Sequence, residues 1–490
     1  MRIGEGLARP GAFADPTHPI HEEAAFGGVS VFFFYASLPP IYFLLRTLRM
    51  SMSQRLPFLI LIMASPLYIF WSRTVMIESC ALFLSLVYLA LAAEYLASPR
   101  PGVAVLTLLT GSLAAMVKLP TFFGFAICSA FLLVADMHRG SIRDRARRQT
   151  HLLFAGCAGI VPGLAGFGWS LYAQAQRALN PLGGFLALNA LSGFTYGTTR
   201  QRFSPELWRV IWMWSIPDIL GSNLLVVPLL ICLPLVRKGQ RTRALSSLAV
   251  FVVVWMTFTN LHYVHSYYQY ANGVFLIAAL GFTIAGLIGL EGGARVSGLI
   301  FLGITVVLAL NQYRATYEKS QESDNISLQN TAKAIQENSN PDDVLMVYGL
   351  DWSPELPYSS HRRSIMVRHG GGPELPQLQR AVANLGKPQD RCGGRLSLRA
   401  NRACDGRAEC LQLRIGCDAE IRRRDLRGLS AFGAAEDVRL MRGAATCHPG
   451  QPAGGECRGA QGRVGRGAVR RSQRVGALAD RDPGDSHLPG

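Results

Sequence analysis

The chain has 490 residues, 49% of them hydrophobic, and a formal net charge of +17 at pH 7. Its apolar residues are concentrated in runs of about 17–22, the length that a helix needs to cross roughly 30 Å of hydrocarbon. So many long runs exclude an ordinary set of soluble domains. The charge does not indicate a nucleic-acid partner, because much of it lies in short loops and in an Arg-rich tail.

The predicted fold is an all-α polytopic membrane protein with about ten transmembrane helices, because helices satisfy their own backbone groups in lipid. Residues 1–24 form an outer N-terminal segment, and residues 25–312 form the membrane domain. The ten predicted spans are approximately 25–45, 56–72, 75–96, 102–117, 120–136, 152–172, 218–236, 244–260, 272–290 and 296–312.

Basic residues cluster in three loops, 46–55, 137–151 and 237–243, which ten spans place on one side of the bilayer. The positive-inside rule assigns that side to the cytoplasm. The long loop 173–217 then lies outside, and its Trp208, Trp212 and Trp214 predict helices in the outer interface, where Trp is enriched.

After the last span, residues 313–370 predict a small extracytoplasmic α/β domain, with a helix near 326–335 and a strand at 344–348. Residues 371–490 differ in composition. From 388 onward there are 19 Arg and no Lys, together with six unpatterned Cys. This range is expected to be disordered or read in a shifted frame, a hypothesis that inspection of the alternative reading frames of the gene tests.

Two ionisable side chains stand near the ends of apolar spans, Glu78 and Lys118. A charge at mid-bilayer costs about 2.5–3.5 kcal/mol on insertion scales, so each calls for a reason. Glu78 either serves a polar cavity or is a helix-start carboxylate favoured by the helix dipole. Lys118 either extends to the interface or binds a phosphate as a point charge. Arg73 is five residues before Glu78, which argues against a pair on one helix face.

The segment 260–270 is the densest polar and aromatic cluster in the sequence. His262 and His265 are spaced i, i+3, but two histidines without a nearby carboxylate are a weak metal signal. They fit better as hydrogen-bonding groups for a phosphate or a sugar. Tyr267 and Tyr268 belong either to the same site or to an aromatic belt at the interface.

Over residues 29–368, these segments resemble the GT-C superfamily of integral membrane glycosyltransferases. The branch is the one that holds protein O-mannosyltransferases and lipid A aminoarabinose or galacturonic acid transferases. The matching features are Ser65-Pro-Leu-Tyr68 with Ser72-Arg-Thr-Val-Met-Ile-Glu78, Lys118-Leu-Pro-Thr121, His262…His265-Ser-Tyr-Tyr268, and Tyr348-Gly-Leu-Asp-Trp-Ser-Pro-Glu-Leu-Pro-Tyr358.

The resemblance implies transfer of a sugar from a polyprenyl-phosphate donor to a lipid, glycan or protein acceptor. It places the protein in the bacterial inner membrane with an extracytoplasmic active face. Glu78 is expected to be catalytic. Arg73, Lys118, His262, His265, Tyr267 and Tyr268 are expected to bind the donor phosphate or sugar. No cofactor is assigned, and no complete ligand set appears for the divalent metal that some family members require.

The family has a further span and an Asp-containing outer loop before the matched region. In this sequence, residues 1–24 contain one Asp, Asp15, in Ala14-Asp-Pro-Thr-His-Pro19. It is included as a catalytic candidate. The matched region is therefore expected to start at the second family helix, with an N-terminally incomplete chain. Two alternatives stay open: a membrane transporter or flippase, and an inactive fragment of the glycosyltransferase.

Overall fold

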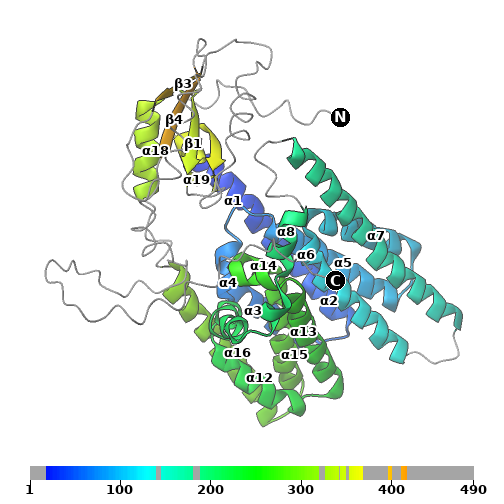
Figure 1. The fold of residues 1–490 in the computed structure, drawn as a ribbon. Helices are drawn as coiled ribbons and strands as arrows, with labels where there is room; N and C mark the ends of the chain where they lie inside the picture. The colour runs from blue at the N-terminus through cyan, green and yellow to red at the C-terminus, as the bar shows by residue number, and fades with distance from the viewer. Residues whose placement is uncertain are drawn as a thin grey trace, which may run out of the picture. The chain divides into compact units, whose positions relative to one another are not determined.

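The computed structural model describes residues 18–139, 145–179, 188–318, 326–341, 343–348, 353–367, 396–399 and 410–415. All of them belong to the unit Met1–Arg439; a second unit comprises Leu440–Gly490. The described part is mostly helical, and Figure 1 shows long helices packed side by side.

By length and composition, six described helices are able to cross a membrane, or seven if one bent pair counts as a span. The bent pair joins Pro205–Leu220 to Asn223–Leu235 at an angle of 86°. These long apolar helices identify an integral membrane protein. The six helices are Gly27–Thr47, Glu78–Ala97, Pro101–Met137, Arg148–Ala178, Ser266–Ile288 and Gly293–Glu318.

This count does not confirm the predicted ten spans, and the differences have physical reasons. Helix α3, Met52–Ala64, has only 13 residues and continues into the short α4, Pro66–Trp71, after a break at Ser65. Helix α13, Lys238–Thr257, begins with a polar segment that lowers its mean hydropathy. The windows 102–117 and 120–136 fall within one element, α6.

Helix α6, Pro101–Arg139, changes direction at Lys118, whose φ of −159° and ψ of 93° are extended rather than helical. The two halves lie side by side, because Tyr88 touches both of them. A Cβ built on Gly111 would lie 2.8 Å from the Tyr88 ring, while the Phe122 ring centroid is 4.9 Å from it. Along a straight helix these two residues would be about 16 Å apart. Pro120 follows the bend, where it starts a new helix without losing a backbone donor.

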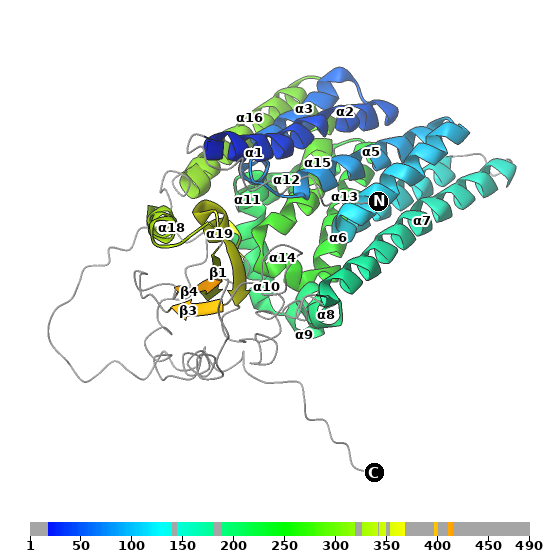
Figure 2. The same cartoon turned by 90° about the horizontal axis from the view of Figure 1, so that it is seen from above.

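The centre of the bundle is α15, Gln269–Ile288, nearly all of which is buried. It packs against α3, α13 and α16, Gly293–Tyr313. Phe58 and Phe282 meet edge to face at 4.8 Å. The Phe58 ring also occupies the space where Gly281 has no side chain. Helix α5, Glu78–Ala97, packs on α6, which in turn packs on α7, Arg145–Ala178 (Figure 2).

The first helices in the described part of the chain are α1, His18–Ala36, and α2, Leu38–Thr47, and they pack on α5. The described part of the long loop after α7 is also helical. It contains α8, Leu188–Tyr196; α9, Thr199–Arg202; α10, Pro205–Val210; the π-helix η2, Ile211–Ser215; and α11, Ile216–Leu220. Trp208, Trp212 and Trp214 are exposed, as an interfacial location requires, but that location stays a prediction.

Shorter elements complete the helical part. They are η3, Asn223–Leu225; α12, Val226–Cys232; η4, Leu233–Leu235; α14, Thr259–Val264; η5, Ser266–Tyr268; and the π-helix η6, Arg314–Glu318. Two of them, α14 and η5, join α13 to α15 and carry the polar and aromatic cluster that the sequence singled out.

The segment after the last span forms a small α/β element. Helix α18, Ile326–Asn338, precedes β1, Val344–Tyr348; α19, Glu355–Ser360, then leads to β2, Arg363–Val367, which pairs parallel to β1. Arg362 donates to the carbonyl oxygen of Ser339 at 2.9 Å and so ties β2 to the end of α18. The membrane side on which this element lies stays a prediction.

Two more strands, β3, Leu396–Arg399, and β4, Cys410–Ile415, complete a sheet of order β2-β1-β4-β3, with antiparallel pairs β1–β4 and β3–β4. Both strands come from the range that composition marks as disordered or frameshifted. The rest of 371–490 lies outside the described residues, so the hypothesis about its reading frame stays a prediction.

Candidate functional site

A buried ion pair joins two helix ends at one end of the bundle, which we call the Glu78 end. Glu78 opens α5, where the helix dipole favours a carboxylate. Lys118 stands at the bend of α6, and its Nζ donates to Glu78 Oε1. The side chains are only 4% and 11% exposed, so water screens this pair little. Forty residues separate the partners in sequence, and the bend of α6 brings them together.

Aromatic rings cover the lysine of this pair. Lys118 Nζ lies 4.1 Å from the ring centroid of Tyr268 and 5.5 Å from that of Tyr267, both in η5. The faces of aromatic rings attract a cation. Tyr267 in turn stacks on His265 at 5.1 Å and meets Trp71 edge to face at 5.7 Å. The structure therefore gathers Glu78, Lys118, Tyr267, Tyr268 and His265 at one place, and their roles in a reaction stay predictions.

The pair leaves one carboxylate oxygen without a partner. Glu78 Oε2 is buried and accepts no hydrogen bond from the described residues. A buried acceptor of this kind costs about 1–3 kcal/mol when it stays unsatisfied. The site thus offers an acceptor from Glu78 and a cation from Lys118, side by side in a water-poor environment. A carboxylate accepts a proton, and a cation stabilises an anionic leaving group. The pair therefore suits a reaction in which one reactant loses a proton and another leaves as an anion.

Next to this pair, two hydrogen bonds join residues that the sequence did not assign to the site. Ser79, the neighbour of Glu78, lies with its Oγ 3.0 Å from Tyr270 Oη. The hydroxyl of Tyr68 donates to the Tyr270 carbonyl oxygen at 2.5 Å. All three side chains are buried. The first hydrogen bond holds the start of α5 against α15, and the second holds α4 against α15. Their signal in the sequence is a polar residue inside each apolar run.

His262 lies beside the ion pair but contacts neither member of it by a described hydrogen bond. Its side chain is buried against Trp255, with ring centroids 5.3 Å apart. Burial, with a smaller contribution from the Lys118 cation, lowers the pKa of His262 to about 3. The ring is therefore neutral near pH 7, and its Nδ1 has no partner among the described residues.

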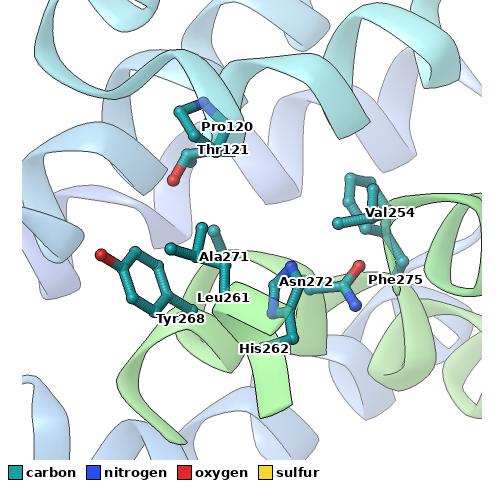
Figure 3. A pocket seen from close by; sticks show the side chains of 9 residues that line it. All are labelled: Pro120, Thr121, Val254, Leu261, His262, Tyr268, Ala271, Asn272 and Phe275. Atoms are coloured by element: carbon teal, nitrogen blue, oxygen red, sulfur yellow. The ribbon is translucent and has the colours of Figure 1, made fainter. Parts of the chain in front are cut away.

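A small pocket opens next to His262, with a volume of about 10 Å³. Figure 3 shows Tyr268 on one side of it and Val254 with Phe275 on the other. Asn272 is a further polar group at its wall, beside His262, Tyr268 and Thr121, and the sequence did not assign it to the site. A buried amide in the first turns of a span is the signal that could have found it. The lining residues are Pro120, Thr121, Val254, Leu261, His262, Tyr268, Ala271, Asn272 and Phe275.

Arg73 is placed differently from the other predicted residues. It is exposed, and its guanidinium donates to the carbonyl oxygen of Ile69 at 2.9 Å and to the hydroxyl of Tyr313. Its guanidinium also lies 5.7 Å from the Tyr313 ring centroid. A role for Arg73 at the donor phosphate stays a prediction, and Asp15 lies outside the described residues.

Asp218 lies in the first turn of α11, whose N-cap residue is Ser215. Its carboxylate accepts a hydrogen bond of 2.7 Å from the Tyr317 hydroxyl. The described residues contain no cluster of three or more His, Cys, Asp or Glu side chains able to hold a metal ion.

Comparison with known proteins gives no family for this chain: no family model matches it, and no curated protein does.

Proposed function

We propose that this chain is a glycosyltransferase that moves a sugar from a polyprenyl-phosphate donor to a hydroxyl of a lipid, glycan or protein acceptor. The observation that carries the proposal is the buried Glu78–Lys118 pair under Tyr267 and Tyr268. It stands at helix ends, where a lipid-linked head group enters from the bilayer. The resemblance to GT-C enzymes adds the donor class.

The proposed reaction follows from the two charges. The acceptor oxygen forms a bond to the anomeric carbon while the bond from that carbon to the phosphate oxygen breaks, and its electron pair stays on the phosphate. Lys118 stabilises the resulting polyprenyl phosphate as a point charge. The proton of the acceptor hydroxyl leaves to a carboxylate. Among the described residues of the site, Glu78 supplies that carboxylate through Oε2.

The pairing explains why both side chains are needed. A lone buried lysine or glutamate tends to lose its charge, since burial disfavours the ionised form. The attraction between the two charges offsets part of this cost until the donor arrives. The phosphate then becomes a second anion for Lys118, and Glu78 is released to accept a hydrogen bond from the acceptor.

The proposal is tested with the full-length protein in lipid nanodiscs. Donors are polyprenyl phosphates carrying mannose, glucose, aminoarabinose or galacturonic acid, and acceptors are lipid A, a lipid-linked glycan and a Ser/Thr-rich peptide. Mass spectrometry measures released polyprenyl phosphate and the mass gain of the acceptor. We expect at least one pair to react, and the double variant Glu78→Gln/Lys118→Met to react about 100-fold more slowly.

The double variant is the appropriate test, because it removes both charges and leaves neither one buried alone. Its matched control is Glu291→Gln/Lys238→Met, which removes one charge of each sign from exposed positions. The control should react as the wild type does. The proposal fails if the wild type uses no donor, or if the site variant is as active as the control.

A further inference from the structure

The pocket beside His262 is small, buried and polar at one wall. Its volume of about 10 Å³ suits one group of the size of a water molecule. Two side-chain atoms of its lining residues are buried without a partner in the described part of the chain, His262 Nδ1 and Asn272 Oδ1. The Asn272 amide nitrogen donates to the Phe251 carbonyl oxygen at 3.3 Å, which leaves Oδ1 as an unused acceptor.

Among the described residues that line the pocket, none carries a charge. His262 is neutral near pH 7, and the remaining residues at the wall are not ionisable except for the Tyr268 hydroxyl. The closest described charges, Glu78 and Lys118, are paired with each other. Tyr268 belongs to both the ion-pair site and the pocket, because Lys118 Nζ lies over its ring and the residue also lines the pocket.

From this geometry we propose that the pocket is a subsite for a hydroxyl group of an uncharged donor sugar, and that it discriminates against amino sugars and uronic acids. The inference rests on the proposed function and specifies its substrate class. A hydroxyl both donates and accepts hydrogen bonds, so it satisfies an imidazole nitrogen and an amide oxygen together. An ammonium or carboxylate group would lose its hydration here and find no opposite charge.

Equilibrium binding tests the proposal without requiring turnover. The wild-type protein in nanodiscs is titrated with bare polyprenyl phosphate and with the same lipid carrying mannose, glucose, aminoarabinose or galacturonic acid. We expect the two neutral sugars to bind about 10-fold more tightly than the bare lipid, because they complete the hydrogen bonds of the pocket. The two charged sugars should bind no more tightly than the bare lipid.

Substitution at Asn272 locates the effect. In Asn272→Leu, which keeps the size of the side chain and removes the acceptor, the advantage of the neutral sugars should fall at least about fivefold. In Asn272→Asp the preference should shift toward aminoarabinose. Asn311→Leu and Asn311→Asp, at an exposed position of α16, are the matched controls. Bare polyprenyl phosphate should bind all these proteins equally, which also shows that they are folded.

Two failures are distinguishable. If bare polyprenyl phosphate and all four sugar lipids fail to bind the wild type, the proposed function is wrong and the inference falls with it. If bare polyprenyl phosphate binds but the charged sugars bind as tightly as the neutral ones, or Asn272→Leu leaves the neutral advantage intact, only the inference is wrong.

Discussion

The two ends of the bundle hold ion pairs of the same chemical kind in opposite environments. At the Glu78 end, Glu78 and Lys118 are almost completely buried. At the other end, Arg100 lies 2.5 Å from Glu94, but these side chains are 60% and 38% exposed. Water screens the exposed pair, so it contributes about 0–1 kcal/mol. A buried pair is different, because removal of one partner leaves a charge that has neither water nor a counterion.

The histidines of the two ends differ in the same way. His262 is buried among aromatic and apolar groups near the cation of Lys118. His151, at the opposite end, is also buried, but its Nδ1 lies 3.0 Å from Asp136 Oδ2. Its Nε2, like His262 Nδ1, is buried without a hydrogen-bond partner among the described residues. The two ends differ more clearly in their carboxylates, because Glu78 Oε2 is buried without a described partner, whereas the Asp136 side chain is 34% exposed and reaches water.

The largest expected effect comes from breaking the buried pair. Lys118→Met should destabilise the protein by about 3–5 kcal/mol, because it leaves the Glu78 carboxylate uncompensated. Thermal unfolding of the detergent-solubilised protein measures this change. The double variant Glu78→Gln/Lys118→Met should recover most of the stability and none of the activity. If the single and double variants were equally stable, the pair would not be coupled in the way that the structure indicates.

The pH dependence of stability should report on the burial of His262. The folded pKa of His262 is about 3, against the usual value of 6.5, so between these values the unfolded chain binds a proton that the folded chain does not. Stability from this group is complete above pH 6.5 and falls as the pH decreases, by at most about 1.4 kcal/mol per pH unit. Unfolding of wild type and His262→Gln at pH 7 and pH 5 measures it. An equal decrease in both proteins would contradict the assignment.

A smaller effect is expected from the aromatic cover of Lys118. Tyr268→Leu removes the ring face over Nζ and should cost about 0.5–2 kcal/mol, whereas Tyr268→Phe keeps the face and should cost less. Unfolding temperatures of the two variants make the comparison. An equal loss in the two variants would show that the hydroxyl, and not the ring face, holds the lysine.

The smallest effect is expected at the exposed pair. Arg100→Met should change the free energy of unfolding by less than about 1 kcal/mol and leave sugar transfer unchanged. The same assays as for Lys118→Met measure both quantities. A loss comparable to that of Lys118→Met would remove the distinction between the two ends.

Much of the helical organisation could be predicted from hydropathy, because a run that spans lipid must satisfy its backbone internally. The number of spans could not be predicted in the same way. Windows such as 56–72 and 218–236 are divided by a break at Ser65 and by a bend after Leu220. Hydropathy averages over a window and so does not register a single residue that leaves the helical conformation.

The candidate site was also predictable in part. Glu78, Lys118, His262 and the tyrosines of η5 stand out as polar groups beside apolar runs, and charge near lipid requires a reason. Ser79, Tyr270 and Asn272 are weaker signals than the charged residues, because an uncharged hydroxyl or amide in a span costs less than a charge. Their importance depends on neighbours from other helices, as in the contact of Ser79 with Tyr270, 191 residues away.

The sequence by itself determined that this chain enters a membrane and that its unusual charges lie near helix ends, since both follow from the transfer of local groups between water and lipid. Only the tertiary structure decided which charges meet. The extended backbone at Lys118 turns α6 and brings the lysine to Glu78, while Arg73 contacts Tyr313 instead. Pairing depends on the angles between helices, and those angles are set by side-chain packing across the whole bundle.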